Sequence, residues 1–187
     1  MSAALRLLGL PALLAALALA WPAASHAAGG NYVFDGGTPA QQREVRDALD
    51  ASAFPWSAVP VQVTIHIARG TDSDAAPGQI WLDADLLEAG RFAWGVVQHE
   101  YAHQVDFFLL DDAKRAELRV LLGAQDWCNY GLGLAHQRYG CERFASTLAW
   151  AYWPSKDNVM RPESASDESA AMAPGAFRVL LARVLSR

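Results

Sequence analysis

VVQHEYAHQVDFF, residues 96–108, carries two histidines, His99 and His103, four positions apart, with Glu100 directly after the first. In a helix, residues four apart project from the same face, so both imidazoles can bind one metal ion. Glu100 points about a quarter-turn to the side, where its carboxylate can reach a water on that metal. The spacing therefore predicts two zinc ligands and a general base on one helix.

The helix that carries this motif is expected from about Arg91 to Phe108, and its two sides differ in composition. At about 100° per residue, one side gathers large apolar side chains and the opposite side gathers the histidines. The first side holds Trp94, Val97, Tyr101, Val105 and Phe108, and the second holds Phe92, Val96, His99, His103 and Asp106. One side is thus predicted to pack into the core, and the other to present the histidines to a cleft.

Residues 1–27 have the order of a secretory signal peptide, with one basic residue, a Leu/Ala-rich run and a short polar end. Cleavage is expected after Ala27. A retained membrane anchor is the alternative, but Pro11 and Pro22 bracket an apolar run that is short for a membrane span. We therefore predict a secreted, extracellular protein in which residues 28–187 form a single domain.

Composition limits the partners of the exported chain. The sequence has 15 Lys and Arg against 20 Asp and Glu and contains no basic run, which argues against nucleic acid or an anionic membrane as a partner. We expect a monomer without stable membrane association. Cys128 and Cys141 are expected to form a disulfide, as is usual for an even count in an oxidising compartment. Two free thiols or a metal-binding pair are the alternatives.

Around the central helix, periodicity predicts a mostly helical α+β chain. Thr38, Pro39 and Gln41 have the pattern of a capping box at the start of a helix. Alternation at period two predicts a strand over 61–67, with His66 on its polar side as an ordinary surface residue. The other expected elements are a flexible leader over 28–37 with a short extended piece, a turn-rich loop over 69–78, a strand over 79–83, helices over 113–123, 142–153 and from Pro174, and a loose polar loop over 154–172.

A catalytic zinc site usually has three protein ligands and one open position, so a third ligand is needed. The extended HExxHxxGxxH pattern is excluded, because Asp106 and Leu109 stand where it requires Gly and His. Glu142, which opens a later helix, is the favoured third ligand. A helix-start glutamate stabilised by the helix dipole is the alternative interpretation, and His136 is the rival ligand.

The stretch HEYAHQVD (99–106), followed by ERFAS (142–146), resembles the gluzincin branch of the zincin metallopeptidases, especially small secreted members and lethal-factor-like catalytic domains. The resemblance covers roughly residues 80–150. It implies a zincin-like α+β fold, mostly helical, with a small sheet whose edge strand borders the active-site cleft. It also implies that His99, His103 and Glu142 bind Zn²⁺ and that Glu100 is the base.

Two residues depart from the family pattern. Ala102 stands where glycine is usual, and it is small enough to keep the helix close to its neighbour. Ser146 stands where some members place an aspartate that supports the metal ligands without binding the metal. This leaves open which residue orients His99. Asp106 could orient a histidine in its place or act as a capping acid near the helix end.

The function expected from these residues is hydrolysis of peptide bonds, with a water activated by zinc as the nucleophile and Glu100 as the general base. Tyr139 and His136 are both candidates for the hydrogen-bond donor that stabilises the oxyanion. A peptide or protein is the expected substrate. The alternatives are a secreted zinc-binding module without catalysis, and a coincidental HEYAH on a structural helix.

Overall fold

The computed structural model of this protein describes residues 29–187, so the signal peptide predicted over 1–27 lies outside the described residues. Within 29–187, six α-helices accompany a four-stranded mixed sheet, which agrees with the predicted α+β class. No helix in this part of the chain has both the length and the hydropathy required to cross a membrane.

The sheet has the strand order β1-β2-β4-β3. Strands β1 (Tyr32–Gly36), β2 (Val63–Ala68) and β4 (Gln79–Asp83) are parallel, and the short β3 (Asp74–Ala76) runs antiparallel to β4. Two predictions were partly wrong. The 28–37 leader contains the expected extended piece, but as strand β1 paired with β2, and the predicted turn-rich loop over 69–78 contains strand β3. The strand predicted over 79–83 is β4, which lies inside the sheet rather than at an edge; the edge strands are β1 and β3.

The helices follow the sequence pattern closely. Helix α1 (Pro39–Ala51) starts with the predicted capping box, in which the Thr38 hydroxyl accepts from the Gln41 amide and the Gln41 side chain accepts from the Thr38 amide. Helix α5 begins two residues before its predicted start. The other helices are α2 (Ala84–Leu87), α3 (Arg91–Leu109), α4 (Asp112–Leu121, capped by Asp111), α5 (Gly140–Tyr152) and α6 (Pro174–Leu185).

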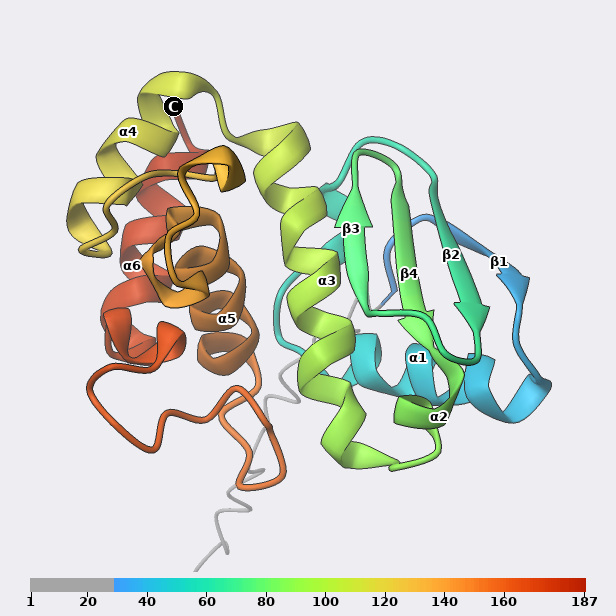
Figure 1. Ribbon diagram of the computed structural model, residues 1–187. Coiled ribbons are helices and arrows are strands. Elements are labelled where there is room, and N and C mark those ends of the chain that lie inside the picture. The colour runs from blue at the N-terminus through green and yellow to red at the C-terminus, as the bar shows by residue number, and fades with distance from the viewer. Residues whose placement is uncertain (1–28) are drawn as a thin grey trace, which may run out of the picture.

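Helix α3 occupies the middle of the molecule, with the sheet and α1 on one side and α5, α6 and α4 on the other (Figure 1). Val97, Tyr101 and Val105 are buried in the core, as their side of the helix predicts. The histidine side is buried as well, because α5 packs along it. The histidines therefore face another helix rather than an open cleft.

Asp106 has neither of the roles considered for it from the sequence. Its buried carboxylate lies 2.8 Å from Arg115 Nε and accepts hydrogen bonds from the Trp127 indole at 3.0 and 3.2 Å. These contacts join the end of α3 to α4 and to the segment before α5. Asp106 is thus a structural link at the far end of the motif.

We expect Asp106→Ala to lower the free energy of unfolding by about 2–4 kcal/mol, because it leaves Arg115 and the Trp127 N–H without their buried acceptor. Denaturant unfolding monitored by circular dichroism measures this change. The matched control is Asp72→Ala, whose exposed side chain lies in the loop before β3. Equal effects of the two substitutions would contradict the structural role of Asp106.

Candidate metal centre

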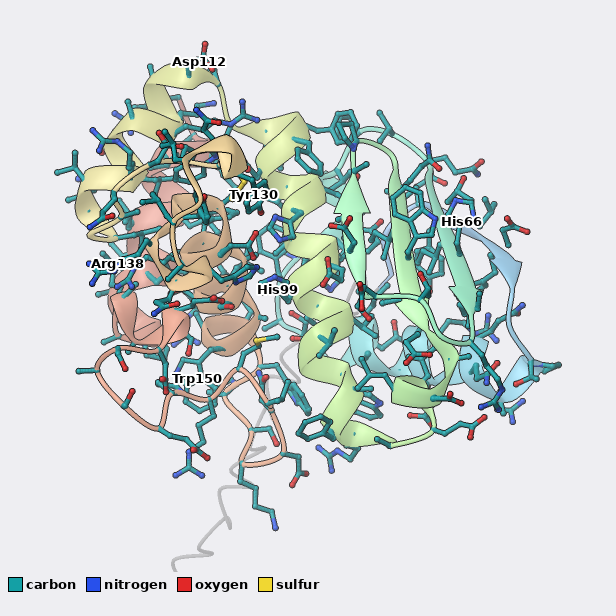
Figure 2. The ribbon with its side chains drawn as sticks, in the orientation of Figure 1. His66, His99, Asp112, Tyr130, Arg138 and Trp150 are labelled. Atoms are coloured by element: carbon teal, nitrogen blue, oxygen red, sulfur yellow. A yellow bond between two sulfur atoms is a disulfide. The ribbon has the colours of Figure 1, made fainter. Side chains whose placement is uncertain are left out.

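His99 and His103 lie one turn apart on α3 with their ring planes nearly perpendicular. Their Nε2 atoms are 3.2 Å apart, and each residue is only 7% exposed. The helix thus brings two imidazole nitrogens to one point, as the four-residue spacing predicts. Figure 2 shows His99 between α3 and the segments beside it, whereas His66 lies away from it on the sheet, stacked on Trp81.

Glu142 reaches the same point from the first turn of α5. Its Oε2 lies 3.2 Å from His99 Nε2 and 3.5 Å from His103 Nε2. Small side chains beside the ligands favour a close approach of the two helices: Ala102 precedes His103 on α3, Ala145 follows Glu142 by three residues on α5, and both are fully buried. The predicted third ligand is therefore brought together with the two histidines.

These three donor atoms have the spacing of a tetrahedral zinc site. For ligands 2.0–2.1 Å from a tetrahedral ion, donor atoms lie about 3.3–3.4 Å from one another, and the observed separations are 3.2, 3.2 and 3.5 Å. Burial alone would raise the pKa of the Glu142 carboxyl, but the imidazoles of His103 and His99 hold that pKa well below its usual range. The residues present therefore fit a zinc ion, and a buried carboxylate among imidazoles is a suitable donor set for it.

Glu100 lies beside this cluster. One of its carboxylate oxygens and one ring nitrogen each of His99 and His103 lie within 4.8 Å of one another. Burial raises the pKa of Glu100, and the neighbouring histidines partly oppose that shift. Among residues 29–187, no side chain donates a hydrogen bond to this carboxylate, so it is free to accept a proton from a bound molecule.

Of the two candidates for the oxyanion donor, the structure brings only one to the cluster. His136 Nε2 lies 3.3 Å from Glu142 Oε2, and the side chain is largely exposed. Tyr139 is buried instead, and its hydroxyl accepts a hydrogen bond from the Leu134 amide at 3.0 Å.

Tyr130, which the sequence reasoning missed, donates a hydrogen bond from its hydroxyl to Glu142 Oε1. Its ring packs edge-on against the Tyr139 ring, with the two ring centroids 4.7 Å apart, and the residue remains half exposed. Figure 2 shows Tyr130 on the same side of α3 as His99. The only sequence signal for it was its place in the aromatic, Gly-rich segment before Glu142.

Cys128 and Cys141 form the predicted disulfide, with Cα atoms 5.7 Å apart. The bond closes the segment that carries Tyr130 and His136, and it ends one residue before Glu142. Tyr130 Oη lies 3.4 Å from Cys128 Sγ and 3.6 Å from Cys141 Sγ. The crosslink therefore restrains the segment beside Glu142, and its sulfurs are not available as thiolate ligands.

Two further residues at the cluster were not predicted as a pair. Ser146 Oγ lies 3.0 Å from His99 Nδ1 and 2.7 Å from Glu168 Oε2. Glu168 comes from the segment 154–172, which was expected to be a loose loop and instead includes a 3-10 helix, η4 (Glu168–Ala171). Nothing in the periodicity of that segment pointed to a site residue.

Two cavities lie along the 156–169 segment. One, of about 890 Å³, is at the N-terminal end of α3 and includes Arg91 and Phe92 but none of the residues of the cluster. The other, of about 420 Å³, shares Val159 and Arg161 with it and includes Ser146 and Glu168. This second cavity therefore reaches the side of the cluster on which Ser146 contacts His99.

No protein-family model, no curated protein and no solved structure matches this chain. The function is therefore inferred from the geometry of the chain's own residues.

We expect the purified protein to bind one zinc ion, and Glu142→Gln to weaken that binding because a neutral amide replaces the anionic donor. Zinc affinity should fall by more than the roughly 10–100-fold that is typical when a hydrogen-bond partner of a ligand, rather than a ligand itself, is removed. Competition with a chromophoric chelator measures the affinity, with the exposed Glu163→Gln as the matched control. Equal affinity of Glu142→Gln and the wild type would contradict the assignment of Glu142 as a ligand.

Proposed function

We propose that this protein is a secreted zinc metallopeptidase with a zincin-like arrangement of the gluzincin type. The observation that carries the proposal is the cluster of three buried donor atoms, from His99, His103 and Glu142, with the carboxylate of Glu100 beside it. A structural zinc site has no need of an adjacent unpaired carboxylate, whereas hydrolysis needs a base at that position. The secreted location follows from the predicted signal peptide and agrees with the disulfide.

Zinc held by these ligands would lower the pKa of a water molecule and polarise the carbonyl of the scissile bond. Glu100 accepts the proton of the attacking water and delivers it to the leaving amine. Its burial favours this role, because a raised carboxyl pKa lies closer to neutrality than that of an exposed glutamate.

The Tyr130 hydroxyl is the better candidate for the donor to the oxyanion. It already donates to Glu142 at the rim of the cluster, and its ring is half exposed, so a substrate carbonyl can reach it. Burial and the Glu142 carboxylate both raise the pKa of Tyr130, which keeps its proton in place. His136 lies at the same rim and can contact substrate from the other side of Glu142 Oε2.

An extended peptide is the substrate that suits the sheet. Strand β3 is an edge strand that lies beside α3 (Figure 1). The side chain of Gln104 on α3 donates to the carbonyls of Ala76 and Gln79, at 2.9 and 3.0 Å, and so holds the β3–β4 hairpin against the metal-bearing helix. An edge strand can bind an extended chain through main-chain hydrogen bonds, which select the backbone more than particular side chains.

The main alternative is a zinc-binding module in which the same cluster has no catalytic role. It shares the ligands with the peptidase and differs in having no use for Glu100. Turnover by the purified protein distinguishes the two.

We expect Glu100→Gln to lower peptide hydrolysis by about 10²–10⁴-fold or more, because general base catalysis is lost, while zinc remains bound. The measurement compares cleavage of a random peptide library, read by mass spectrometry, with zinc content. Glu117→Gln on α4 is the matched control, since its carboxylate pairs with Arg183 and Arg187 at the surface. Unchanged turnover in Glu100→Gln would rule out the base, and a wild type that holds zinc without cleaving any peptide would favour the binding module.

Tyr130→Phe should lower kcat by about 10–1000-fold, because it removes one donor to the oxyanion. Since the same hydroxyl also donates to Glu142, kcat is measured with zinc in saturating excess. Tyr139→Phe removes a hydroxyl from a residue of the same type in the same segment, but one that is buried away from substrate, so its effect on kcat should be much smaller. Steady-state kinetics on the best library peptide give both values. A larger loss in Tyr139→Phe would return the role to the residue expected from the sequence.

A further inference from the structure

Glu168, which lies outside α3 and α5, reaches the side of the site on which Ser146 contacts His99. The two oxygens of Glu168 contact different partners: Oε2 lies 2.7 Å from Ser146 Oγ, and Oε1 lies 2.6 Å from His136 Nδ1. Ser146 Oγ is in turn 3.0 Å from His99 Nδ1. One side chain from the 154–172 segment therefore connects two imidazoles of the cluster.

The proton on each of these atoms follows from the chemistry of the groups. An ionised carboxylate can only accept hydrogen bonds, and a serine hydroxyl has one hydrogen to donate. The hydrogen of Ser146 therefore goes to Glu168, and Ser146 Oγ must accept from His99 Nδ1–H. This leaves the lone pair of His99 on Nε2, the atom that faces Glu142 Oε2 and His103 Nε2.

The same reasoning applies to His136. Its Nδ1–H donates to Glu168 Oε1, which directs Nε2 towards Glu142 Oε2 at 3.3 Å. Because His136 is otherwise largely exposed, this hydrogen bond is the contact that keeps its ring at the rim of the site.

We propose that Glu168 is a positioning residue that fixes the tautomer of His99 through Ser146 and holds His136 over the metal centre. This inference rests on the proposed zinc site. Ser146 is too short and carries no charge, so it cannot by itself support a metal-binding histidine as a carboxylate does. Glu168 supplies that charge from another segment, with the serine hydroxyl as the relay.

Direct ligation by Glu168 is the competing role, because one ligand atom each of His99, Glu142 and Glu168 lies within 4.8 Å of the others. Both Glu168 oxygens are already occupied by hydrogen bonds, however, and its contact with His99 passes through Ser146. A positioning role uses these contacts as they stand, whereas ligation would break them.

The decisive variant is Glu168→Gln. The new amide can donate to Ser146 Oγ, which turns the serine hydrogen towards His99 Nδ1 and favours the tautomer with hydrogen on Nε2, which cannot bind metal. We expect zinc affinity, measured by chelator competition, to fall by about 10–100-fold. The visible spectrum of the Co²⁺-loaded protein should change with it. Glu163→Gln, an exposed change in the same segment, should leave both unchanged.

Two further variants separate positioning from a loss of folding. Ser146→Ala removes the relay but keeps the Glu168–His136 contact, so it should lower zinc affinity about as much as Glu168→Gln. Adding Ser146→Asp to Glu168→Gln places a carboxylate directly behind His99 and should restore zinc affinity, but it should not restore kcat fully, because His136 stays unsupported. Thermal unfolding of the metal-free proteins reports folding independently.

Wild-type zinc affinity and an unchanged Co²⁺ spectrum in Glu168→Gln would overturn the inference, as would failure of Ser146→Asp to restore affinity in a folded protein. These readouts need no turnover, so they remain decisive if the wild type binds zinc but cleaves no peptide, in which case the proposed peptidase function alone fails. A wild type that binds no zinc would overturn both.

Discussion

The close contact between α3 and α5 is the constraint on which the rest of the structure depends. The donors come from both helices, and Glu142 Oε2 must come within 3.5 Å of the Nε2 atoms of His99 and His103. Short side chains near the ligands favour such an approach, and Ala102 and Ala145 are both small and fully buried. Ala102 replaces the glycine usual in the family that the motif resembles, and its single methyl group fits in the core. The apolar side of α3 then secures the helix against the sheet, so that the interhelical distance is set from both sides.

Burial makes the charges of the site depend on one another. Three carboxylates, Glu100, Glu142 and Glu168, lie within or beside the cluster, and burial alone would raise the pKa of each. Hydrogen bonds to imidazoles reverse that shift for Glu142 and Glu168, but Glu100 has no donor among residues 29–187 and keeps a raised pKa. Burial of the Glu100 carboxylate is costly, and the neighbouring histidines offset only part of that cost. A divalent cation among the donors would offset that cost, and this gives the electrostatics a reason to favour metal binding independent of the motif.

What could be predicted from the sequence was local. The capping box of α1, the length of α3 and the start of α6 at Pro174 follow from patterns within a few residues, and the 99–103 spacing already contains two of the three proposed ligands. Strand β3 was missed because three residues within a polar loop show no period, and they become a strand only by pairing with β4. Glu168 was missed for a similar reason. Its partners Ser146 and His136 are 22 and 32 residues away in the sequence, so no local pattern in its own segment indicates these contacts.

The residues of the site come from two kinds of structure, the helices α3 and α5 and the irregular segment between α4 and α5. His99, His103 and Glu142, the proposed metal ligands, lie on helices and are almost fully buried, where backbone hydrogen bonds and packing hold them rigidly. Tyr130 and His136 lie in the segment between α4 and α5, and both side chains are more than half exposed, so a substrate can reach them. The helical turns of this segment are short 3-10 turns, and a backbone bridge between Asp126 and Tyr139 joins its two ends. The Cys128–Cys141 disulfide restrains it from one side and Glu168 from the other. Tyr130 and His136 can therefore stay accessible and still keep a defined position relative to the buried cluster of His99, His103 and Glu142.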